Sequence, residues 1–109
     1  MAVLTVQQIS LAGLEPAFVA ADAEGDEFVN SGRVFLHVKN GDALAATVTI
    51  DSQAPCNYGF DHNVEVSVPA GEERLIGPFK RNRFNNSEGK VQVAYSSVSN
   101  LTVAAVELP

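Results

Sequence analysis

The chain has 109 residues, a hydrophobic fraction of 46% and a formal net charge of −6 at pH 7. This length indicates one domain spanning residues 1–109, with enough apolar side chains for a core, and the composition excludes wholesale disorder. The acidic balance argues against non-specific binding to nucleic acids or anionic membranes, because such binding requires a basic surface.

Short strand signals begin at the N-terminus. Residues 3–9 predict a first strand, because polar and apolar side chains alternate along it. A turn is expected over 11–16, a short strand over 18–21 and an acidic loop over 22–26. Phe28 and Val29 then lead into an Asn-Ser-Gly turn. The first quarter of the chain is therefore expected to be extended and rich in turns.

The clearest strand is residues 33–39, which place Val34, Leu36 and Val38 on one face. Asn40-Gly41 follows directly, and this dipeptide is typical of tight hairpin turns because both residues tolerate a positive φ. Residues 46–51 then alternate again, with Val48 and Ile50 facing inward. The sequence predicts that these two strands form a hairpin.

The second half of the chain repeats the same rhythm. Strands are expected over residues 63–68, 74–76, 90–95 and 101–108, and residues 96–100 are expected to join the last two as a hairpin. The apolar phase slips at Ala104-Ala105, which predicts a bulge, and residues 80–89 are expected to form a polar loop.

Together these signals predict an all-β fold with almost no helix. Seven to nine short strands in one domain are typical of an antiparallel β-sandwich, with either jelly-roll or immunoglobulin-like topology. An antibody-type domain is not expected, because the sequence has one cysteine and no tryptophan.

Catalytic and metal-binding patterns are weak. Cys56, Asp61 and His62 share one Pro/Gly-containing segment, but no flanking motif of a nucleophile and its base accompanies them. With Asp51 they do not match the spacing of zinc ligands, and the acidic loop at 22–26 does not match a calcium-binding loop. We therefore expect neither an enzyme nor a cofactor, and a single cysteine allows no disulfide within the chain.

A small basic cluster with neighbouring aromatic residues marks a candidate contact surface. Cations around an aromatic anchor suit an acidic protein partner, and the alternative is that these phenylalanines close one end of the sandwich. The irregular segments 57–62 and 79–86 would carry the contact, with the N-terminal strand as a further candidate. The candidate interface residues are Tyr58, Phe60, Phe79, Lys80, Arg81, Arg83 and Phe84.

Three segments carry a resemblance to a known group of proteins. They are GRVFLHVKNG at 32–41, VPAG at 68–71 followed by LIGPF at 75–79, and VQVAYS at 91–96. With the opening Met-Ala-Val, the chain resembles small proteins encoded in the structural modules of tailed phages and prophages, some of which decorate the phage head. The resemblance implies a self-associating accessory protein, often trimeric, bound to the major capsid protein on the outside of the virion.

The rival interpretation is a stand-alone β-sandwich module that binds a carbohydrate or a surface protein. Carbohydrate modules generally display tryptophan or tyrosine on a flat face, and this chain has no tryptophan and two tyrosines. The N-terminus lacks a basic stretch followed by a long apolar run, so no signal peptide is expected. We therefore expect synthesis and assembly in the host cytoplasm.

Overall fold

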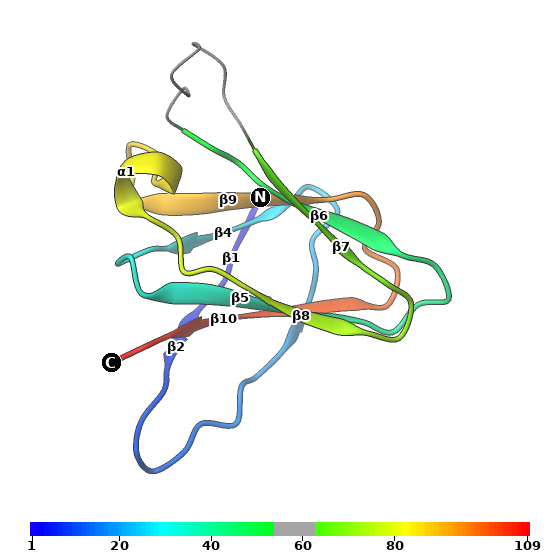
Figure 1. Cartoon of the computed structure of the whole chain (residues 1–109), viewed down its shortest axis with the longest axis horizontal. Helices are drawn as coiled ribbons and strands as arrows, with labels where there is room; N and C mark the ends of the chain where they lie inside the picture. Colours follow the sequence, from blue (N-terminus) through cyan, green and yellow to red (C-terminus); the bar gives the residue numbers. More distant parts are fainter. Residues whose placement is uncertain (54–62) are drawn as a thin grey trace.

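Two β-sheets face each other (Figure 1), and a hydrophobic core lies between them. The structure is a computed structural model and describes residues 1–53 and 63–109. Within these residues it contains ten strands and one four-residue helix. They are β1 (Ala2–Val3), β2 (Val6–Gln8), β3 (Val19–Ala20), β4 (Asp26–Val29), β5 (Val34–Asn40), β6 (Ala46–Ile50), β7 (Val64–Val68), β8 (Glu73–Ile76), α1 (Arg81–Phe84), β9 (Lys90–Tyr95) and β10 (Leu101–Glu107).

The first sheet has the strand order β1-β4-β9-β6-β7, and the second has the order β2-β10-β5-β8, with β3 also paired to β10. The predicted all-β sandwich is confirmed. Two details of the prediction are wrong. The described residues contain ten strands rather than seven to nine, and the sheets are mixed, because β1 and β2 run parallel to β4 and β10.

The antiparallel pairs are nested along the chain. The innermost pair is β6 with β7, followed outward by β5 with β8, β4 with β9 and β3 with β10. Successive pairs alternate between the two sheets, as they do when one long hairpin wraps around a core. This connectivity is that of a jelly roll rather than an immunoglobulin domain.

The hairpin predicted between β5 and β6 is wrong, because these strands lie in opposite sheets. Neither Asn40 nor Gly41 has the positive φ that a tight two-residue turn requires. The buried side chain of Asn40 instead donates hydrogen bonds to the carbonyls of Leu44 (2.9 Å) and Val68 (3.0 Å). The connection therefore crosses between the sheets. The hairpin predicted between β9 and β10 is wrong for the same topological reason.

The bulge predicted in β10 is also wrong. Its register with β5 is unbroken from the Leu101–Asn40 pair to the Glu107–Val34 pair. The apolar phase slips because β10 is buried on both faces, including at Ala104. On the outer face, the ring of Phe18 packs edge-on against His37, with 4.9 Å between ring centroids. His37 is paired with Ala104, so the segment before β3 covers part of this face.

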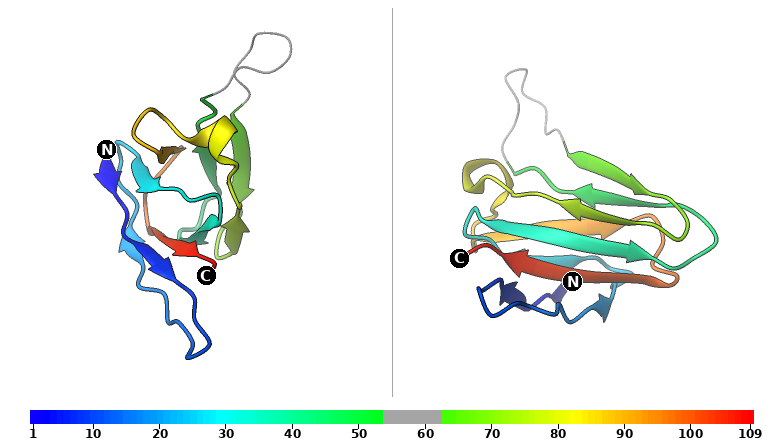
Figure 2. Two further views of the ribbon diagram at one scale, coloured as in Figure 1. Left: turned by 90° about the vertical axis from the view of Figure 1, so that its left-hand side faces the viewer. Right: turned by 60° about the horizontal axis from the view of Figure 1, so that its bottom comes forward.

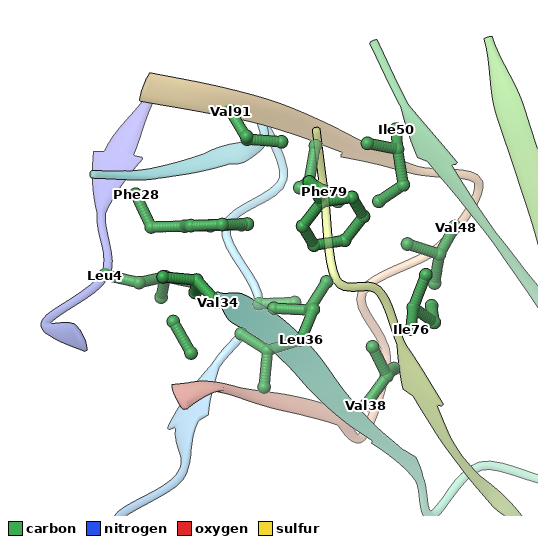
Figure 3. Packing of buried hydrophobic residues seen from close by; sticks show 14 of the residues in the cluster. Leu4, Phe28, Val34, Leu36, Val38, Val48, Ile50, Ile76, Phe79 and Val91 are labelled. Atoms are coloured by element: carbon green, nitrogen blue, oxygen red, sulfur yellow. The ribbon is translucent and has the colours of Figure 1, made fainter. Parts of the chain in front are cut away.

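The core fills the space between the sheets, and Figure 3 shows its central side chains. Leu36 and Val38 point inward from β5, and Val48 and Ile50 point inward from β6, all with no exposed area. The inward faces predicted for these strands are confirmed. Burying each of these side chains stabilises the fold by about 1.5–3 kcal/mol relative to leaving it exposed.

The predicted strand over residues 3–9 is split between the two sheets. Its first part, β1, pairs with β4, and its second part, β2, pairs with β10. Leu4 lies between them, and its side chain is buried in the core. Residues 1–8, called the N-terminal strap below, thus run along one side of the sandwich from one sheet to the other (Figure 2).

The strand directions define two ends of the sandwich. The end that contains α1, called the α1 end below, also carries residues 30–33, 77–89 and 108–109. The opposite end carries residues 21–25, 41–45, 69–72 and 96–100. In Figure 1 the two ends lie at the left and the right of the view.

Candidate functional site

The α1 end presents the three cations of the predicted contact. Lys80 directly precedes α1, and Arg81 and Arg83 lie within it; all three side chains are exposed. Sequence reasoning expected a polar loop here, and the structure instead has one short helical turn within that segment. Tyr58 and Phe60, predicted for the same contact, lie outside the described residues.

Phe79 and Phe84, predicted as aromatic anchors of the contact, are buried, with 3% and 6% of their area exposed. The Phe79 ring centroid lies 5.7 Å from that of Phe28 and 5.5 Å from that of Phe84. Figure 3 shows Phe79 among the core side chains. These rings close the end of the sandwich and hold α1 on it, so the folded domain does not offer them to a partner.

The chain reaches α1 through a close contact between backbones. Gly77 has a φ of 128°, and a Cβ atom there would lie 2.9 Å from Cβ of Phe35, so only glycine fits without a shift. Farther on, the backbone N–H of Gln53 donates a 2.8 Å hydrogen bond to the carbonyl of Arg83. The helical turn is thus held at its end by the chain that follows β6.

A pair of asparagines fixes the segment after α1. The side chain of Asn30 donates to the Phe79 carbonyl (3.0 Å) and to Oδ1 of Asn85 (2.7 Å). The Asn85 amide donates in return to the Asn30 carbonyl (3.1 Å). Sequence analysis identified Asn30 only as a turn residue, and nothing local to the sequence signals its partner 55 positions away.

The charge of the α1 end is largely uncompensated. Within the part of the chain that the structure describes, Arg33, Lys80 and Arg81 form no ion pair. The guanidinium of Arg83 lies over the Phe84 ring, 4.7 Å from its centroid. Phe84 belongs to the core, so its buried ring anchors α1 to this end of the sandwich.

The opposite end carries acidic side chains, among them Asp22, Glu24, Asp42 and Glu72. The N-terminal ammonium lies 4.0 Å from the Glu24 carboxylate, and Arg74 lies 3.1 Å from Glu72. Because the cations gather at the α1 end and these carboxylates at the opposite end, the two ends of the domain carry opposite charge. The acidic loop that the sequence predicts over residues 22–26 and the predicted basic cluster thus lie at opposite ends of the sandwich.

A shallow polar cleft of about 810 Å³ lies beside α1. Its lining residues are Lys80, Arg81, Asn82, Asn85, Asn86, Ser87 and Gly89. Its two charged side chains are cations, and the others are amides or a hydroxyl, so it favours hydrogen-bond acceptors and negative charge.

The other sequence candidates for chemistry give no site in the described residues. Cys56, Asp61 and His62 lie outside residues 1–53 and 63–109. Oδ2 of Asp51 accepts a 2.9 Å hydrogen bond from the Gln53 side chain. Among the described residues, no three His, Cys, Asp or Glu side chains are grouped so that they would hold a metal ion. None of the described helices is long and apolar enough to cross a membrane.

One carboxylate is buried where the sequence predicts an exposed acidic loop. Asp26, expected in a loop, begins β4 and is 1% exposed. Its Oδ2 accepts hydrogen bonds from the Tyr95 hydroxyl (2.7 Å) and from the backbone N–H of Asp22 (3.3 Å). Burial, together with the hydrogen bond to Asp26, raises the pKa of Tyr95 well above its usual range.

An apolar groove of about 320 Å³ lies beside the N-terminal strap. The strap contains the N-terminal strand that the sequence analysis gives as a further candidate for the contact. None of the groove's lining residues is charged. They are Val3, Leu4, Thr5, Gln7, Ala17, Val19, Val103, Ala104 and Ala105. Four large apolar side chains of this region are at least half exposed: Met1, Val3, Leu11 and Val19.

Comparison with known proteins adds no relative. The chain matches no protein-family model, no curated protein and no solved structure. Two surfaces of the described residues are the candidates for contact with a partner, the basic α1 end and the apolar groove beside the N-terminal strap.

Proposed function

We propose that this chain is a non-enzymatic structural protein that binds the outside of a phage capsid and stabilises it, as a homotrimer. Its partners are the major capsid protein and further copies of itself, and its place is the virion. The observation that carries the proposal is the exposed pair Lys80 and Arg81, which form no ion pair in the described residues and lie at the start of α1, a turn anchored to the core by Phe84.

Electrostatics supports a defined orientation on the partner. The chain has a net charge of −6, yet its α1 end is basic. An acidic patch on the capsid would attract this end and repel the opposite one, which favours a single docking orientation. Exposed charges mainly raise the association rate, and each contributes little affinity. Attachment of a trimer at several points would multiply a weak contact into stable binding.

The capsid test is sedimentation of the purified chain with empty capsids of the major capsid protein encoded in the same structural module. The charge-reversal variant Lys80→Glu/Arg81→Glu should lose binding at least tenfold. The matched control is Lys39→Glu/Arg74→Glu, which makes the same change in net charge away from the α1 end and should retain binding. Phe84→Ala is not a useful probe, because Phe84 belongs to the core.

Two results would overturn capsid binding through the α1 end. One is wild-type affinity in the Lys80→Glu/Arg81→Glu variant, and the other is equal loss in the control. Light scattering tests the trimer separately, and a stable species of three times 11.5 kDa is expected across a concentration series. A strict monomer would remove the self-association part of the proposal.

The second candidate function is a module that binds a carbohydrate or a surface protein. The polar cleft beside α1 favours it, because its asparagine amides both donate and accept hydrogen bonds, as sugar hydroxyls require. A glycan array separates the two candidates. Specific glycan binding that Asn82→Ala abolishes would support the module, and a blank array with intact capsid binding would support the structural protein.

A further inference from the structure

We infer that the N-terminal strap is exchanged between copies, so that residues 1–8 of one chain pair with β4 and β10 of a second copy. On each body, residues 1–8 of a neighbouring copy then fill the place that the chain's own residues 1–8 have in the single copy. The inference deepens the self-association part of the proposed function and rests on that part alone. It does not depend on capsid binding.

The jelly roll is complete without the strap. The nested pairs from β3 with β10 to β6 with β7 account for eight strands and both sheets. The strap adds two register pairs at β4 and three at β10, all in parallel orientation. Removing it from its own body therefore breaks no pair of the jelly roll itself.

Exchange would keep every contact that holds the strap. Leu4 is its one buried side chain. Its backbone N–H donates to the Glu27 carbonyl (2.7 Å), and that of Ala2 donates to the Gly25 carbonyl (3.1 Å). Identical bonds form when the strap comes from a second copy, because the acceptors lie on the body. Only the connecting segment must change, and this makes such exchanges low in cost.

The connecting segment has the features of a hinge. It reverses direction in a turn closed by one hydrogen bond, from the N–H of Gly13 to the Ser10 carbonyl (3.0 Å). Leu11, at the tip of this turn, is fully exposed. Pro16 disfavours helix in the residue before it and so favours an extended path.

The hinge is also long enough to reach a neighbour. The Gln7 amide donates to the Ala17 carbonyl (2.9 Å) and accepts from the Ala17 N–H (2.8 Å), which fixes both ends of the connection. Residues 9–16 lie between these ends. The Ile9 N–H also donates to the Glu107 carbonyl (2.9 Å), so the free stretch is residues 10–16. Fully extended, these seven residues span about 23 Å, more than the 20 Å shortest dimension of the molecule. Straightening the hinge therefore delivers the strap to an adjacent copy.

The apolar surface around the strap indicates where the copies would touch. Met1, Val3 and Val19 are 50%, 59% and 51% exposed, and the groove beside them is lined by no charged side chain. In a single copy this surface faces solvent. Exchange places two bodies side by side along the strap, and this contact buries part of the apolar surface. The burial stabilises the exchanged form, whereas opening the hinge alone would bury no apolar area.

The test is a disulfide placed across the strap. Val3 and Glu27 are register partners on β1 and β4, so the variant Val3→Cys/Glu27→Cys links the strap to whichever body holds it. Cys56, the one native thiol, is replaced by serine. With exchange, oxidation yields covalent oligomers on a denaturing non-reducing gel. Without exchange, it yields a disulfide within one chain that migrates as a monomer.

The control variant Thr49→Cys/Glu65→Cys joins β6 to β7 within one body and should give only the intrachain disulfide. Wild-type light scattering completes the test. An oligomer whose strap disulfides are intrachain overturns the exchange and leaves self-association standing, whereas a monomer overturns both. If the double variant misfolds, co-refolding the single variants Val3→Cys and Glu27→Cys decides, because their mixed disulfide forms only between chains.

Discussion

The Tyr95 hydroxyl donates a 2.7 Å hydrogen bond to Oδ2 of Asp26 and so joins the end of β9 to the start of β4 across a buried carboxylate. Removing the hydroxyl leaves this carboxylate with one partner fewer in a desolvated position. Tyr95→Phe is therefore expected to lower the free energy of unfolding by about 1.5–3 kcal/mol in urea titrations at pH 7. A double-mutant cycle with Asp26→Asn should show coupling, and purely additive losses would contradict a direct interaction.

The same pair predicts a loss of stability at alkaline pH. The Tyr95 pKa is raised in the folded state, and a tyrosine in the unfolded chain ionises near pH 10. The hydroxyl's contribution is therefore complete below about pH 10 and falls as the unfolded state begins to lose its proton. The stability advantage of wild type over Tyr95→Phe should shrink by about 1.4 kcal/mol per pH unit above that point. Urea titrations between pH 8 and pH 11 measure this, and a constant difference would refute it.

Phe84 is expected to matter for stability and not for recognition. Its ring fills the end of the core against Phe79, so Phe84→Ala should cost about 3–5 kcal/mol in thermal or urea unfolding. Arg81→Ala, on the exposed side of the same helical turn, should change stability by less than about 0.5 kcal/mol. Equal costs at the two positions would mean that α1 is not organised as the structure has it.

Alternation predicted which face of β5 and of β6 is buried, but not which strands lie beside them. Val34 and Val48 were placed correctly in the core, because a period of two depends only on local sequence. Partner choice depends on contacts far apart in the chain. Asn40-Gly41 has the composition of a tight turn, yet the hydrogen bonds of Asn40 to the Leu44 carbonyl in the crossover and to the Val68 carbonyl in the opposite sheet override that local preference.

For the candidate site, the sequence predicted the exposed charged residues but not the direction of the neighbouring aromatic side chains. Lys80 and Arg81 are charged, so their exposure follows from their chemistry. Phe79 and Phe84 flank them in the sequence but turn the other way, and no short-range pattern distinguishes a core phenylalanine from an exposed one in an irregular segment. The splitting of the strap between two sheets was equally hidden, because residues 3–9 read as one continuous strand.

Asn40 is expected to be the most sensitive polar residue of the crossover between the sheets. It is 3% exposed, and its amide donates to carbonyls in the crossover and at the end of β7. Asn40→Ala removes both of these hydrogen bonds from a buried position and should cost about 1–3 kcal/mol. Asn40→Asp should cost more, because it sets a buried carboxylate against carbonyl oxygens. Urea titrations at pH 7 rank the variants, with Asn82→Ala on the exposed side of α1 as the control. If Asn40→Asp is as stable as wild type, the side chain does not bridge the sheets through its amide donor.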